Sequence, residues 1–211
     1  HICRGNANRG KGNLLGSRDD FENALQRDRR RLEAYIGRGF ANYKLGRHEV
    51  AIADFRQALE IDPKSVEALT DLANVLADDN QLDRARQTFE EAVRIAERDP
   101  GPLMRRAAVL AAAGAPQEAL ADNEAALRLA PRNFQAYLSR AHTHLWRADY
   151  RAAQADLTEA DRLSPNNPLV LNVRGRVNWK QGNLRAALTD LDAAHKLSPN
   201  RWEILRDRGI V

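Results

Sequence analysis

The stretch that decides the fold is residues 32–65, LEAYIGRGFANYKLGRHEVAIADFRQALEIDPKS, because its spacing returns along the chain. Pro63, Pro131, Pro165 and Pro199 lie 68, 34 and 34 residues apart. With a proline at the thirty-second place, units start at residues 32, 66, 100, 134 and 168, with partial units before and after. A fixed period of this length predicts a stack of repeated supersecondary units.

Small residues stand at the same places of each unit, counted from its first residue. The eighth place is always Gly or Ala: Gly5, Gly39, Ala73, Ala107, Ala141, Gly175 and Gly209. The twenty-seventh is always Ala: Ala24, Ala58, Ala92, Ala126, Ala160 and Ala194. Small residues at fixed places let helices approach closely. The fifteenth place holds Gly12, Gly46, Asn80, Gly114, Ala148 and Gly182, and Gly or Asn there suits a left-handed helix end.

Each unit therefore predicts a helix of about 13 residues, a short turn, a second helix of about 14 and a turn marked by proline. The expected units are a partial repeat at 1–31, repeats at 32–65, 66–99, 100–133, 134–167 and 168–201, and a partial repeat or capping helix at 202–211. Neither helix of a unit can bury its apolar stripe alone, so stacking predicts a single all-α, right-handed solenoid over residues 1–211. We expect the least regular packing near residues 97–103, where Glu97 replaces the proline. Because the chain begins with His rather than Met, we expect a fragment of a longer protein.

The small residues at places eight, twenty and twenty-seven, the Gly after the first helix and the proline resemble the tetratricopeptide repeat family, in its bacterial type. Asn123 departs from the pattern, since the other units hold Phe or Leu there. The resemblance implies a helical superhelix that acts as a non-enzymatic scaffold and binds a protein or peptide segment in a concave groove. It leaves the oligomeric state open.

An arginine at the seventh place goes with an aspartate at the twenty-third. The pairs are Arg4 with Asp20, Arg38 with Asp54, Arg106 with Asp122, Arg140 with Asp156, and Arg174 with Asp190. The remaining unit changes both, to Leu72 and Thr88. In an antiparallel hairpin these places lie at about the same height, within reach of a bidentate contact. We interpret the pairs as structural ion pairs rather than repeated anion sites, with pairing to the next unit left open.

The resemblance also implies that ligand-facing side chains come from the first helix of each unit, at places two, five, six, nine, twelve and thirteen. The candidate groove residues are Phe40, Tyr43, Asn74, Arg105, His142, Trp146, Arg176, Trp179 and Lys180. The N-terminal half adds the acids Glu33, Glu67, Asp71 and Asp78, whereas the C-terminal half is basic and aromatic. Trp and Arg are enriched in binding hot spots, so the C-terminal half fits a partner segment with acidic and apolar residues. The alternative is that Trp146 and Trp179 only pack against the next helix.

One known function of the family is not implied. In the family, a carboxylate clamp that binds the tails of chaperones is formed by Lys and Asn in one unit, Asn in the next unit, and Lys and Arg in a third. Here Asn74 stands at one of these places, but Thr70 and Ser139 replace Lys and Arg. The carboxylate clamp is therefore absent.

The charge of +4 comes from residues 1–31, with eight Arg and Lys against four acids, whereas the rest of the chain has 25 of each. This distribution argues against a nucleic-acid stripe. The sequence shows no catalytic constellation, metal spacing, cofactor motif or membrane span, and it leaves both cytoplasm and periplasm open. Two alternatives to a simple scaffold remain: a regulatory or targeting module of a larger enzyme, or a scaffold that contacts a polyanion or polysaccharide in export or processing.

Overall fold

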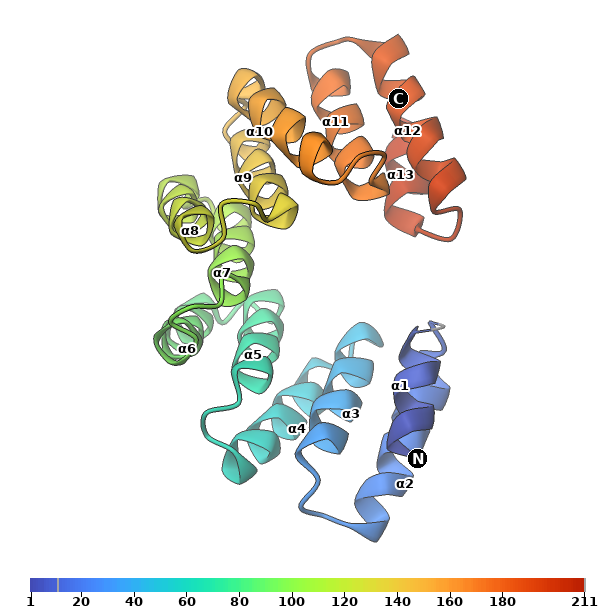
Figure 1. Ribbon diagram of the computed structural model, residues 1–211. Coiled ribbons are helices and arrows are strands. Elements are labelled where there is room, and N and C mark those ends of the chain that lie inside the picture. The colour runs from blue at the N-terminus through green and yellow to red at the C-terminus, as the bar shows by residue number, and fades with distance from the viewer. Residues whose placement is uncertain (11, 211) are drawn as a thin grey trace. The chain divides into compact units, whose positions relative to one another are not determined.

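The computed structural model describes residues 1–10 and 12–210, and only the backbone of Trp202. These residues form 13 α-helices and no strand, which confirms the all-α fold (Figure 1). In chain order the helices are α1 (Ile2–Gly10), α2 (Leu14–Arg27), α3 (Leu32–Lys44), α4 (His48–Ile61), α5 (Val66–Asp78), α6 (Leu82–Ile95), α7 (Gly101–Ala112), α8 (Pro116–Leu129), α9 (Phe134–Trp146), α10 (Tyr150–Leu163), α11 (Pro168–Lys180), α12 (Leu184–Leu197) and α13 (Trp202–Ile210).

Helix lengths follow the repeat. The first helices α3, α5, α9 and α11 have 13 residues, and the second helices have 14. Side-chain oxygens of Ser65, Asn133, Asp149 and Asn167 accept hydrogen bonds from backbone N–H groups in the first turns that follow them. Such caps satisfy donors that have no partner within the helix. α7 has 12 residues and begins at Gly101, whose N–H donates to Asp99 Oδ1 at 2.8 Å.

The turn after each first helix depends on one residue with a left-handed backbone. The φ angle is positive at Gly12, Gly46, Asn80, Gly114, Ala148 and Gly182, which are the residues of the fifteenth place. The next N–H then reaches back over the helix end, as Arg47 N–H donates to Asn42 O at 2.9 Å. This is the Schellman arrangement, which satisfies carbonyl groups at the C-terminus.

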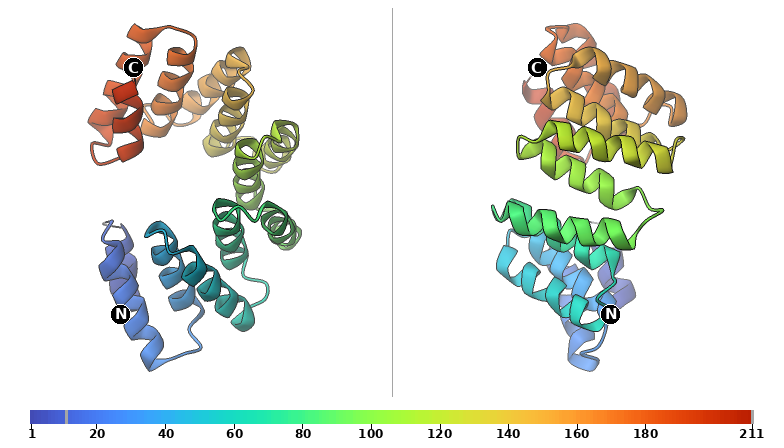
Figure 2. Two further views of the ribbon diagram at one scale, coloured as in Figure 1. Left: turned by 180° about the vertical axis from the view of Figure 1, so that it is seen from behind. Right: turned by 90° about the vertical axis from the view of Figure 1, so that its left-hand side faces the viewer.

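The chain divides into two compact units, His1–Arg105 and Arg106–Val211. In the first unit, α1, α3 and α5 contact one another in order, and each also packs on the second helix that follows it (Figures 1 and 2). In the second unit, α11 contacts both α9 and α13, α9 and α11 pack on the helices that follow them, and α13 packs on the preceding α12 (Figure 1). The first helices α1, α3 and α5 therefore form one side of the first unit, and α9, α11 and α13 form one side of the second. One solenoid over residues 1–211, and an irregular seam near 97–103, remain predictions.

The core depends on a large residue beside a small one. Phe55 and Leu191, at the twenty-fourth place, are fully buried. A Cβ added to Gly39 would lie 2.9 Å from Phe55 Cε1, and one added to Gly175 would lie 2.8 Å from Leu191 Cγ. An alanine at Gly39 or Gly175 would therefore force the facing side chain to shift, whereas Ala73 is accommodated opposite Phe89 in its own unit.

Asn123 occupies the same place in α8 and is also fully buried. Its Nδ2 donates to Thr143 Oγ1 at 2.8 Å, so the departure from the pattern is a buried polar contact between α8 and α9. Among the described residues, no helix has the length and apolarity that crossing a membrane requires.

Candidate functional site

The repeated arginines lie against the aspartates with which they share a hairpin. The contacts from Arg to Asp oxygen are Arg4 Nε to Asp20 at 2.5 Å, Arg38 Nη2 to Asp54 at 2.6 Å, Arg106 Nη2 to Asp122 at 2.6 Å, Arg140 Nη2 to Asp156 at 2.6 Å and Arg174 Nη2 to Asp190 at 2.7 Å. In α12, Asp190 accepts from both Nε and Nη2 of Arg174, at 3.0 and 2.7 Å, a bidentate contact. The hydrogen bond to this carboxylate raises the pKa of Arg174.

A third residue joins four of these five pairs, and sequence reasoning missed it. Asn8, Asn42 and Asn178 donate to the same aspartates, at 2.9, 3.2 and 3.0 Å. His144 lies at the equivalent place, with Nε2 3.7 Å from Asp156 Oδ2. The signal was present in the sequence, because all four stand at the eleventh place, four residues after the arginine.

The arginines also reach the preceding hairpin. Arg38 contacts Glu22 of α2, and Arg174 Nη1 lies 3.6 Å from Asp161 of α10. In the unit without the pair, Leu72 is buried in an apolar cluster, and Thr88 donates instead to the carbonyl of Arg84 at 2.8 Å.

In the first unit, the candidate groove residues on α3 are held by contacts among themselves and with neighbouring helices. Tyr43 Oη donates to Asp78 Oδ2 at 2.5 Å, and burial with this hydrogen bond raises the pKa of Tyr43. Lys44 Nζ lies 4.7 Å from the centroid of the Tyr43 ring, and the Arg9 guanidinium lies 5.4 Å from that of Phe40. Cations therefore already cover these aromatic faces.

Asp71, on the acidic half of the expected groove, is 6% exposed and has a partner. Arg105 Nη1 donates to Asp71 Oδ1 at 2.8 Å, so the structure places Arg105 in the first unit against α5. Burial raises the pKa of Asp71, and Arg105 opposes that shift. Asn74, one helical turn further on, is half-buried. This face is less acidic than the sequence implies, because one carboxylate is buried in an ion pair.

In the second unit, four candidate groove residues come together around a pocket of about 470 Å³ between α9, α11 and α13. Its lining consists of Leu145, Trp146, Ala148, Tyr150, Arg176, Trp179, Lys180, Arg206, Asp207 and Ile210. Trp146 is 61% exposed, whereas Trp179 is half-buried with Lys180 Nζ 4.3 Å from its ring centroid. The structure thus brings Trp146, Arg176, Trp179 and Lys180 to one concave place.

The wall that α13 adds was not among the candidates. Asp207 is 6% exposed and accepts from Asn172 Nδ2 at 3.1 Å and Arg206 Nη2 at 2.8 Å. Arg176 Nε lies 3.8 Å from the other side of this carboxylate, at Oδ2. Arg206, Asp207 and Ile210 stand at places five, six and nine of the last partial unit. The rule that identified the other groove residues would therefore have found them, had it been applied to that unit.

His142 lies near this pocket but does not line it. It is half-buried, and burial together with the charge of Arg176 lowers the pKa of its imidazole to about 4. The side chain is therefore neutral at pH 7. Among the described residues, no group of three or more His, Cys, Asp or Glu side chains could hold a metal ion.

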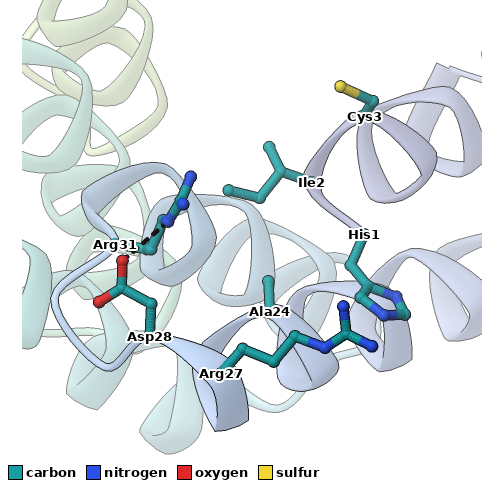
Figure 3. A pocket seen from close by; sticks show the side chains of 7 residues that line it. All are labelled: His1, Ile2, Cys3, Ala24, Arg27, Asp28 and Arg31. Carbon is teal, nitrogen blue, oxygen red and sulfur yellow. Dashed lines mark hydrogen bonds and ion pairs between the residues drawn. The ribbon is translucent and has the colours of Figure 1, made fainter.

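A smaller pocket of about 310 Å³ lies where the start of α1 meets the end of α2 (Figure 3). It contains none of the candidate groove residues. Arg31 Nε donates to Asp28 Oδ2 at 2.9 Å, and this pair lies at the end of the pocket opposite Cys3. This pocket lacks the aromatic surface of the one in the second unit.

Comparisons with known proteins agree on the repeat. Tetratricopeptide repeat profiles match residues 4–66 and 138–201, and a second such profile matches residues 42–103. No curated protein matches the chain.

Solved structures with low sequence identity share the fold. A tetratricopeptide repeat protein from Parabacteroides merdae is 20% identical, with a TM-score of 0.84 over 99% of this chain and 82% of that chain. A thermophilic TPR protein from Thermus thermophilus is 22% identical, with a TM-score of 0.74 over 85% of this chain and 98% of that one. YrrB, a TPR protein with an unusual peptide-binding site, is 20% identical, with a TM-score of 0.52 over 90% and 97% of the two chains. With these helical hairpins and with repeat profiles over most of its length, the chain belongs to the tetratricopeptide repeat family.

Proposed function

We propose that this protein is a non-enzymatic scaffold that binds a segment of another protein in the pocket between α9, α11 and α13. Tetratricopeptide repeats generally mediate protein–protein interactions. The observation that carries the proposal is the convergence of Trp146 and Trp179 with Arg176 and Lys180 at one concave place. Large aromatic and arginine side chains in a pocket have the chemistry of a binding hot spot.

The exposure of Trp146 supports binding over packing. A tryptophan that only filled space between helices would be buried, but 61% of Trp146 is accessible. The half-buried Trp179 gives the pocket a rigid aromatic side, and such side chains lose little conformational entropy on binding. The cationic rim adds preference for a segment with acidic residues. The Arg–Asp pairs, by contrast, are part of each hairpin, and we propose a structural role for them.

The test is selection from a phage-displayed peptide library, followed by titration of the selected peptides. We expect peptides with acidic and apolar residues. Trp146→Ala/Trp179→Ala should weaken their binding at least about tenfold, in the range of hot-spot truncations. The matched control is Leu129→Ala/Leu197→Ala, which removes two exposed apolar side chains outside the pocket. Equal binding by the two double variants would contradict the proposal.

A polyanion-binding scaffold is the second outcome of this test. The solved structures that share the fold include IFIT1 with Gppp-AAAA, at 17% identity and a TM-score of 0.69. If no peptide is selected, and a heparin oligosaccharide or a single-stranded oligonucleotide binds with a steep salt dependence, the pocket serves a polyanion. A regulatory role within a larger enzyme would use the same peptide contacts.

A further inference from the structure

Positive charges outnumber negative charges in the lining of the pocket of the second unit, and they differ in how closely they contact the carboxylate. Arg176, Lys180 and Arg206 carry three positive charges, and Asp207 carries the one negative charge among the residues that line the pocket. Arg206 is engaged with Asp207, since its Nε and Nη2 lie 3.0 and 2.8 Å from Oδ1. Arg176 Nε is 3.8 Å from Oδ2, too far for a hydrogen bond. Arg176 therefore keeps its N–H groups available to a ligand although Asp207 lies at ion-pair distance, and Lys180 adds a second positive charge.

The apolar part of the pocket lies beside these two cations. Trp146 and Ile210 are 61% and 53% exposed, and Lys180 Nζ lies over the ring of Trp179. A ligand carboxylate would gain from Arg176 and Lys180 but would be repelled by Asp207. Such a carboxylate would therefore sit on the Lys180 side, where an apolar side chain of the same ligand could cover Trp146 and Ile210. This arrangement calls for an acidic residue adjacent to an apolar one in the bound segment.

We propose that the pocket is a receptor for a carboxylate next to an apolar side chain in a protein segment, and that Asp207 determines its charge specificity. The inference rests on the proposed function and names the chemistry of its partner. Asp207 accepts hydrogen bonds from Asn172 and Arg206, so its carboxylate is held in place in the lining of the pocket. It reduces the net charge of the pocket from three positive to two, which suits one or two carboxylates and disfavours dense polyanions.

If Asp207 sets charge specificity, replacing it should change the affinity for an acidic peptide in the direction opposite to that expected if Asp207 were only structural. Asp207→Asn keeps one acceptor oxygen, which can serve Arg206, and loses the oxygen to which Asn172 donates. It also removes the repulsion of the ligand carboxylate. If Asp207 only held α13 in place, the same variant would loosen the pocket and weaken binding. If it sets charge specificity, binding of an acidic peptide becomes tighter. If the Asp207 carboxylate and the ligand carboxylate are about 7 Å apart, with an effective dielectric constant of about 40, removing their repulsion should tighten binding roughly three- to tenfold.

The experiment uses the whole chain, labelled with ¹⁵N, and two blocked peptides, acetyl-Phe-Glu-Phe-Glu-amide and acetyl-Phe-Gln-Phe-Gln-amide. Affinity is read from shifts of the indole N–H signals of Trp146 and Trp179 and checked by calorimetry. We expect the Glu peptide to bind the native chain at least about fivefold more tightly than the Gln peptide. Asp207→Asn should tighten the Glu peptide about three- to tenfold and leave the Gln peptide unchanged. Lys180→Ala should weaken the Glu peptide by a similar factor, whereas Lys196→Ala, an equal charge change on α12 outside the pocket, should not.

The possible results separate this inference from the proposed function. Equal binding of the two peptides, or weaker binding of the Glu peptide to Asp207→Asn, overturns the charge specificity while leaving a peptide scaffold in place. No binding of the Glu peptide to the native chain also overturns it. If a heparin oligosaccharide displaces the Glu peptide at lower concentration than the Glu peptide itself requires, the occupant is a polyanion and the inference is wrong. Loss of all peptides only in Trp146→Ala/Trp179→Ala supports the proposed function without supporting the role of Asp207.

Discussion

At the scale of single residues, the turn after each first helix depends on one left-handed position. Four of the six residues there are glycine, which has no Cβ to clash with the following carbonyl, and Asn80 is the next most tolerant type. Ala148 holds the same conformation with φ of 57°. For an ordinary L-residue this costs roughly 1–2 kcal/mol, so Ala148 is a site of backbone strain in the second unit.

Ala148→Gly should therefore stabilise the protein. Relief of the strain favours the folded state, whereas the greater freedom of glycine in the unfolded chain offsets about 0.4–1 kcal/mol of that gain. We expect a net increase of about 0.5–1 kcal/mol in the free energy of unfolding, measured by urea denaturation. Gly182→Ala is the matched reverse change at the next turn and should destabilise by a similar amount. A lower stability of Ala148→Gly would contradict the account of strain.

At the scale of the helix hairpin, the Arg–Asp pair joins the two helices through hydrogen bonds, as between Arg174 and Asp190. Asp190 is 8% exposed and accepts from both Arg174 and Asn178, so removing the arginine leaves a buried carboxylate with only an amide partner. An isolated buried charge is costly, although the intact pair contributes little net stability. The hairpin with Leu72 and Thr88 shows that the two places can change together without loss of the fold.

Arg174→Leu should destabilise the protein by about 2–4 kcal/mol, because the charge of Asp190 is stranded. Asp190→Thr added to it copies the natural combination and should recover at least half of that loss. A double-mutant cycle from urea denaturation measures the coupling. Additive losses in the two single variants and their combination would show that the pair does not act as a unit.

The repeat made much of each hairpin predictable and less of the site. Helix lengths, the left-handed turn and the Arg174–Asp190 contact follow from spacings within one unit, since each depends on residues fewer than 34 positions apart. The pocket wall depends on the approach of α13 to α11, and Arg105 pairs with Asp71 one full unit away. A side chain such as Arg105 has several acids within reach of its long stem, so spacing alone does not decide which one it meets.

At the scale of the whole molecule, acid stability provides a test of how tightly the first helices of the second unit pack. His142 on α9 is half-buried, faces the charges of Arg176 and Asp207, and has a pKa lowered from 6.5 to about 4. Burial also lowers the pKa of His144, whereas burial raises the pKa of Asp54 and Asp71. The two carboxylates bind protons more readily in the folded state, so their contribution has the opposite sign to that of the histidines.

Stability should therefore fall on acidification by an amount that depends on His142. Below a pH of about 6.5 the imidazole of His142 binds a proton in the unfolded chain, whereas in the folded protein it does so only near pH 4. Acidification between these values therefore stabilises the unfolded state relative to the folded state. The full stability is present above about pH 6.5, and by pH 5 the loss from this group is about 2 kcal/mol. His142→Gln removes the titrating group but leaves the carboxylates and His144 as they are. The native chain should lose about 2 kcal/mol more than His142→Gln between about pH 7.5 and pH 5 in urea denaturation, and parallel losses would mean that His142 is solvated in the folded protein.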